Sequence, residues 1–185
     1  MGEPATKEVL SLDQLEAAGN LRSGRKHILS ILVENKPGVL TRITGLFARR
    51  GFNIDTLAVG PTDDDSVSRI TLTLDGAVHP IDQVTKQLHK LINVLKIRDL
   101  EPEETLSREL ALFKVAADGA SRGEAMQICE IFRAKIVDVT KRSLIVEVTG
   151  TNEKVEAFER LIRPFGLIEM ARTGEIAIAR GRGET

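Results

Sequence analysis

Aromatic side chains are scarce in this sequence of 185 residues, which contains six phenylalanines and neither tyrosine nor tryptophan. A hydrophobic core must therefore be built mainly from valine, isoleucine and leucine. Proteins that bind single-stranded nucleic acids or sugars commonly stack these ligands on exposed aromatic rings. The shortage of such rings counts against these classes of binding protein.

Long apolar runs, paired cysteines and an excess of one charge are also missing. Cys129 is the single cysteine, which excludes an intramolecular disulfide and favours a cytoplasmic location. No apolar run approaches the roughly 20 residues that span a bilayer, and the N-terminus lacks the features of a secretory signal. The formal net charge of −1 gives no general attraction to nucleic acid or anionic membranes. We therefore expect neither nucleic acid nor a membrane as a partner.

Strand-like and helix-like apolar patterns alternate between residues 25 and 100. The third strand alternates Ile70, Leu72 and Leu74 with polar residues, which predicts that one of its faces meets water. The expected elements are strands at 27–33, 52–59, 69–74 and 94–98, with helices at 39–50 and 80–91. This order, βαββαβ, is typical of a ferredoxin-like sandwich, in which two helices cover one face of an antiparallel sheet.

The same order of elements repeats in the second half, at residues 109–183, after an acidic stretch at 101–108 that predicts a linker. Ser121 and Glu124 form a potential capping box for its first helix, and Thr151 or Asn152 is expected to cap its second. Residues 1–24 are expected to be a mobile N-terminal extension. The sequence thus predicts an α+β fold made of two ferredoxin-like βαββαβ sandwiches.

The turn between the first strand and the first helix, Asn35–Gly38, is a candidate ligand site. A helix N-terminus presents unpaired N–H groups and a partial positive charge, and Gly38 has no Cβ to obstruct a carboxylate. Asn35 and Asn53 add amides that can bind polar ligand atoms. On these local features alone, a simple turn with Asn35 capping the helix is the better interpretation.

The segments Ile31–Leu40 and Gly45–Ile54 resemble the amino-acid-binding ACT domain of acetolactate synthase small subunits. A generic ACT domain would match only this first half, whereas the second half also resembles the small-subunit family. Further matching segments lie at 61–64, 68–71, 87–91, 108–110, 130–139 and 171–174. The resemblance covers residues 26–182 and implies an ACT domain at 25–100 followed by a C-terminal regulatory domain at 109–183.

The resemblance implies a regulatory role in the biosynthesis of valine, leucine and isoleucine. It implies a homodimer that forms through the ACT domains, edge to edge, with a branched-chain amino acid, usually valine, bound at the interface. Backbone donors suit the carboxylate of this effector, the two asparagines its polar ends and the aliphatic residues its side chain. One chain would supply Asn35, Gly38, Val39 and Leu40, and the other chain would supply Asn53 and Ile54.

The resemblance also implies a partner, the large catalytic subunit of acetolactate synthase. That subunit would carry thiamine diphosphate, magnesium and FAD, and would condense two pyruvates or pyruvate with 2-oxobutyrate. This chain is expected to have no catalytic residue, cofactor or metal of its own. It would activate the catalytic subunit and mediate feedback inhibition by valine or a related amino acid.

Three alternative functions compete with this interpretation. The chain could be an ACT-domain amino-acid sensor that regulates a different partner. RNA-recognition modules share the βαββαβ order but need a basic face and aromatic residues on the central strands, and segments 27–33 and 68–74 contain no aromatic residue. An enzyme fused to a sensor is disfavoured because both halves have sensor-like patterns, which leaves no catalytic domain.

Overall fold

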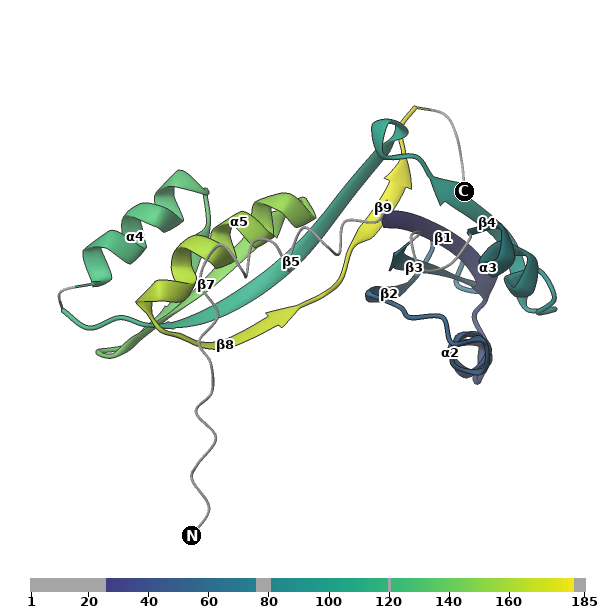
Figure 1. Cartoon of the computed structure of the whole chain (residues 1–185), viewed down its shortest axis with the longest axis horizontal. Coiled ribbons are helices and arrows are strands. Elements are labelled where there is room, and N and C mark those ends of the chain that lie inside the picture. Colours follow the sequence, from purple (N-terminus) through teal and green to yellow (C-terminus); the bar gives the residue numbers. More distant parts are fainter. Residues whose placement is uncertain (1–25, 76–80, 120, 182–185) are drawn as a thin grey trace, which may run out of the picture.

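The computed structural model describes residues 26–75, 81–119 and 121–181. The chain forms two antiparallel sheets that lie side by side, each with two helices on one face (Figure 1). The predicted extension at 1–24 lies outside the described residues. None of the helices in the described ranges is long and apolar enough to cross a membrane.

The first sheet contains four strands in the spatial order β2-β3-β1-β4, so β2 and β4 are its edges. Ile31 at its centre pairs with Ile70 on one side and with Ile97 on the other. The buried faces of the two helices supply Val39, Ile43, Phe47, Val84 and Leu88 to the core above these strands. The elements are β1 (Lys26–Glu34), α2 (Val39–Arg50), β2 (Thr56–Pro61), β3 (Val67–Asp75), α3 (Ile81–Leu88) and β4 (Val94–Leu100).

The second sheet repeats this arrangement in the order β6-β7-β5-β8, with β9 paired to β5. Its core is built around Phe158, whose ring centroid lies 5.1 Å from that of Phe113 and 5.5 Å from that of Phe132. The elements are β5 (Thr105–Ala116), α4 (Arg122–Ile131), β6 (Lys135–Val139), β7 (Ser143–Gly150), α5 (Asn152–Ile162), β8 (Leu167–Arg172) and β9 (Ile176–Ala179). The structure confirms the predicted α+β fold of two ferredoxin-like sandwiches.

The segment predicted as a linker, 101–108, has regular structure. Pro102–Glu104 forms a short 3₁₀ turn, and Thr105 already begins β5. The first residues of β5 pair with β9, from Thr105 opposite Ala179 to Arg108 opposite Ile176. This strand pair could not be found from local sequence because its two partners are far apart along the chain.

The expectation that one face of the third strand meets water is wrong. Thr71 is 2% exposed and Thr73 is 3% exposed on β3, and Ser30 of β1 is fully buried. The Ser30 and Thr73 hydroxyls are hydrogen-bonded, since Arg69 donates to Ser30 Oγ at 2.8 Å and the Thr56 and Thr73 hydroxyl oxygens lie 2.8 Å apart. Strand β9 contacts β1 and β4 (Figure 1), so the second half of the chain helps to cover this sheet.

Other local expectations have mixed outcomes. Thr151 caps α5, since its hydroxyl accepts a hydrogen bond from the Lys154 amide at 3.4 Å. The capping box at Ser121 does not form, because the Ser121 hydroxyl donates to Asp118 Oδ1 at 2.9 Å and makes no cap hydrogen bond. Strand β2 begins at Thr56 and is thus shorter than the strand expected at 52–59.

Candidate functional site

Helix α2 begins directly after Gly38, which has a left-handed backbone with φ of 84°. Residues with a Cβ rarely adopt this conformation, so the turn favours glycine. A Cβ placed on Gly38 would meet no atom within 4 Å. The start of the helix has no side-chain cap and no acidic residue in its first turn. The backbone here is therefore accessible, and no carboxylate in that turn offsets the positive end of the helix.

Asn35 fixes the turn in front of the helix without capping it. Its backbone amide donates to the Ser66 carbonyl at 2.7 Å, and its side-chain amide donates to the Asp65 carbonyl at 2.9 Å. The alternative in which Asn35 caps the helix is thus wrong. The side-chain oxygen of Asn35 takes no part in the bond to Asp65, and it could accept a hydrogen bond from a ligand.

A polar network beside this turn was not predicted from the sequence. Asn93, just before β4, donates to the Glu34 carboxylate and accepts a hydrogen bond from Arg42 of α2 at 2.9 Å. The Asn93 hydrogen bond, and then Lys36, lower the pKa of Glu34. Asn93 therefore ties the loop before α2 to the helix itself. Glu34 and Arg42 flank the turn in sequence, but nothing local links them to Asn93.

The aliphatic candidates differ in exposure. Leu40 is 39% exposed, whereas Val39 is only 5% exposed and belongs to the core. Ile54 is half-buried and packs against the same core. Leu40 is thus the aliphatic side chain of the turn that is most available to a ligand.

Asn53 and Ile54 lie beyond the other end of α2. Gly51 ends the helix with φ of 68°, and the exposed Asn53 donates to Asp55 Oδ1 at 3.1 Å. Helix α2 has 12 residues, which correspond to about 18 Å at a rise of about 1.5 Å per residue. One chain therefore groups Asn35, Gly38, Val39 and Leu40 at the start of α2 and leaves Asn53 and Ile54 apart from them.

Two hollows in the described part of the chain lie where the second half meets the first sheet, and none of the six predicted site residues lines either. One, of about 350 Å³, is mainly apolar and lies between β2, β3 and the β5–β9 pair. The other, of about 410 Å³, is polar and includes Thr56, Leu57, Asn152 and Arg172. The size of a hollow in one chain does not identify the candidate site, since a site shared by two chains is open in either chain alone.

Comparison with known proteins identifies the family in both halves of the chain. A family model described as an AHAS small subunit-like ACT domain matches residues 29–96. A second model, described as the small subunit of acetolactate synthase, matches residues 108–181.

Individual relatives match over most of their length. The acetolactate synthase small subunit of Mycolicibacterium smegmatis is 51% identical over 155 residues, covering 84% of this chain and 91% of the relative. A probable acetolactate synthase small subunit of Methanothermobacter thermautotrophicus is 52% identical over 156 residues, covering 84% and 93%. The crystal structure of the acetolactate synthase small subunit from Thermotoga maritima superposes with a TM-score of 0.78 at 42% identity, covering 86% of this chain and 99% of that one. The chain therefore belongs to the family of acetolactate synthase small subunits.

Proposed function

We propose that this chain is the regulatory subunit of an acetolactate synthase, which binds a branched-chain amino acid and adjusts the activity of a catalytic subunit. Family membership supports the partnership with a large subunit. The observation that carries effector binding is the accessible start of α2, where Gly38 leaves the backbone open and no side chain caps the helix.

The effector carboxylate binds the backbone N–H groups in the first turn of α2, which carry the positive end of the helix dipole. The side-chain oxygen of Asn35 accepts a hydrogen bond from the effector ammonium group. Leu40 contacts the aliphatic side chain, which favours valine and its relatives over polar amino acids. Val39 lies beneath this position and supports it from the core.

A second copy of the chain completes the site with Asn53 and Ile54. Each chain presents the two halves of the site at opposite ends of α2, so two chains related by a two-fold axis form two equivalent sites. Strand β2 is an edge of the first sheet and follows directly after Asn53–Asp55. Pairing of the two β2 edges joins the ACT domains into a homodimer and brings the half-sites of both chains to one interface.

The reaction chemistry belongs to the large subunit. That subunit holds thiamine diphosphate, magnesium and FAD and condenses two pyruvates, or pyruvate with 2-oxobutyrate. The present chain binds the catalytic subunit in the cytoplasm, raises its activity and transmits inhibition by valine. Such control requires that valine bind two arrangements of the complex with different affinity.

Calorimetry on the purified chain with valine, leucine and isoleucine tests effector binding. Gly38→Asp should weaken binding by at least about tenfold, because it adds a bulky negative group where the carboxylate binds. Gly181→Asp is the matched control, since Gly181 also has a left-handed φ of 73° and open space around its Cα. Equal affinity in wild type and Gly38→Asp would refute the proposed carboxylate site.

Reconstitution with the catalytic subunit tests the partnership. The chain alone should not condense pyruvate, and adding it should raise the activity of the catalytic subunit and make that activity sensitive to valine. Pyruvate condensation by the chain alone would contradict a purely regulatory role. Valine binding without any effect on the catalytic subunit would favour the alternative, a sensor for a different partner.

A further inference from the structure

Gly174 lies at the point where the second half of the chain touches the start of β2. It is buried in the turn between β8 and β9, with a left-handed φ of 79°. A Cβ on this residue would lie 3.2 Å from Thr56 Cβ, 3.3 Å from the Leu57 carbonyl oxygen and 3.4 Å from the Leu57 nitrogen. Two of these neighbours are backbone atoms, which cannot rotate away. Only glycine therefore fits the contact without displacing one of the two segments.

The β2 side of this contact is continuous with a proposed half of the effector site. Thr56 and Leu57 follow Asn53 and Ile54 within a few residues. The Asp55 amide donates to the Thr73 carbonyl at 3.0 Å, and the Thr56 hydroxyl is hydrogen-bonded to that of Thr73. Because only Ile54 and Asp55 separate Asn53 from Thr56, a shift of Asn53 would be passed along the chain to Thr56 and Leu57, and the bonds to Thr73 would transmit it to β3.

The other side of the contact is fixed to the second sheet. The Thr173 amide donates to the Leu110 carbonyl at 3.0 Å, and the Leu110 amide donates to the Thr173 hydroxyl oxygen at 3.1 Å. Arg172 forms an ion pair with the buried carboxylate of Glu109 and donates to Asn152 Oδ1 at 2.8 Å. These bonds link the turn to β5 and to the start of α5. A displacement of the turn therefore moves elements that belong to the C-terminal domain.

We propose that the turn Thr173–Glu175 is the coupling contact through which the effector site acts on the C-terminal domain. The inference rests on the proposed function, because it takes Asn53 and Ile54 as effector contacts. Gly174 binds no effector and acts by position alone: it keeps the turn against Thr56 and Leu57. An effector that shifts the segment before β2 then changes the positions of β5 and β9. Coupling between the two sites requires such a difference in contacts between two arrangements of the chain.

A first experiment needs no effector. Hydrogen exchange is measured on the full chain for wild type, Gly174→Ala and Gly181→Ala. Gly181→Ala introduces the same left-handed strain without a close neighbour. Gly174→Ala should speed exchange by at least about tenfold both in 53–61 and in 105–112, while the control changes both by less than about twofold. Unchanged exchange in 53–61 in Gly174→Ala would overturn the proposal.

A second experiment separates valine binding from the response to valine. Gly174→Ala should keep the valine Kd within about threefold of wild type by calorimetry, yet lose at least about half of the maximal inhibition in the reconstituted holoenzyme. Normal inhibition in a folded Gly174→Ala protein would overturn the coupling role. If Gly174→Ala fails to fold, Thr173→Val, which removes the hydroxyl that binds Leu110, decides by the same two measurements.

The failure of the coupling contact is distinguishable from failure of the proposed function. A wild-type chain that binds no branched-chain amino acid refutes the effector assignment. In that case the hydrogen-exchange comparison still decides whether Gly174 couples the two segments. If Gly174→Ala binds valine and its reconstituted holoenzyme is inhibited normally, the coupling contact is refuted and the proposed function stands.

Discussion

Glu175 is the clearest case of a single charged residue in an unfavourable place. It is 8% exposed and is the last residue of the turn Thr173–Glu175, which contacts β2. Burial raises the pKa of its carboxyl group, and the nearby carboxylates of Glu109 and Glu153 raise it further. Lys26 and Arg172 act in the opposite direction without cancelling the effect. The folded chain therefore disfavours the ionised form of Glu175.

This raised pKa predicts a pH dependence of stability with a definite sign. Above the ordinary pKa of about 4.5, the unfolded chain releases the Glu175 proton before the folded chain does. The contribution of Glu175 to folding is thus full at lower pH and is lost as pH rises through the raised folded pKa. Glu175→Gln, which cannot ionise, should become increasingly more stable relative to wild type as pH rises above the ordinary pKa of about 4.5.

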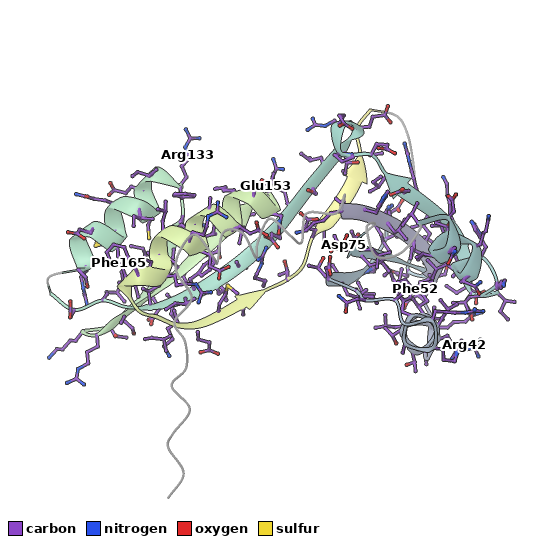
Figure 2. The ribbon with its side chains drawn as sticks, viewed as in Figure 1. Arg42, Phe52, Asp75, Arg133, Glu153 and Phe165 are labelled. Atoms are coloured by element: carbon purple, nitrogen blue, oxygen red, sulfur yellow. The ribbon has the colours of Figure 1, made fainter. Side chains whose placement is uncertain are left out.

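Urea unfolding at several pH values checks this prediction. Glu153, at the end of α5 nearest the first sheet (Figure 2), provides a control of opposite sign, because a hydrogen bond from Thr151 lowers the pKa of its carboxyl group. Wild type should therefore lose stability relative to Glu153→Gln as pH falls below the ordinary range of glutamate. If wild type becomes more stable relative to Glu175→Gln as pH rises, the pKa of Glu175 is not raised in the folded chain.

At the scale of elements, the helix starts show that similar sequence signals can have different outcomes. Thr151 binds the Lys154 amide and caps α5, whereas Ser121 binds Asp118. Removal of a capping hydroxyl exposes an unsatisfied N–H group at the helix start.

We therefore predict that Thr151→Ala lowers the free energy of unfolding by about 1 kcal/mol. Ser121→Ala should cost less than about half of that, because Ser121 makes no cap hydrogen bond. Urea unfolding of the two variants in parallel measures the difference. Equal losses would mean that the hydroxyl of Thr151 contributes no more than that of Ser121.

Strand β5 is the element that joins the two halves of the molecule. Its first residues pair with β9, and its later residues form the centre of the second sheet between β7 and β8. A change at the upper end of β5 therefore reaches the C-terminal core without passing through a flexible connection (Figure 1). This continuity allows the small contact at Gly174 to act on the whole second sheet through β5.

At the scale of the whole molecule, the proposed effector site requires two chains. The start of α2 and the segment 53–54 are separated by the length of that helix in one chain. Gly38→Asp damages one half of each site, and Asn53→His damages the other half. Each variant alone should therefore lose binding at both sites of its homodimer.

A mixture of these two variants tests the shared site directly. Unfolding and refolding them together in equal amounts gives about half mixed dimers, and each mixed dimer has one intact site out of two. Calorimetry should then recover about a quarter of the wild-type binding capacity, at wild-type affinity. No recovery in a mixture shown to contain mixed dimers would place the whole effector site within one chain.

The sequence determined the order of elements and the family, because both follow from local sequence patterns. Apolar spacing distinguishes strands from helices, and the turn with Gly38 is a short local motif. These signals predicted both sandwiches, and the structure confirmed them.

Only the tertiary structure decided which surfaces are covered and which distant groups meet. Four findings depend on segments that are far apart in sequence. They are the burial of Thr71 and Thr73, the pairing of β9 with β5, the hydrogen bonds of Asn93 and the fit of Gly174 against Leu57. Alternation of polar and apolar residues reports which side chains share a face of a strand. It does not report whether another part of the chain packs over that face. Such packing depends on long-range strand pairing and on contacts of backbone atoms, which are alike in every residue and therefore leave no signal in the sequence.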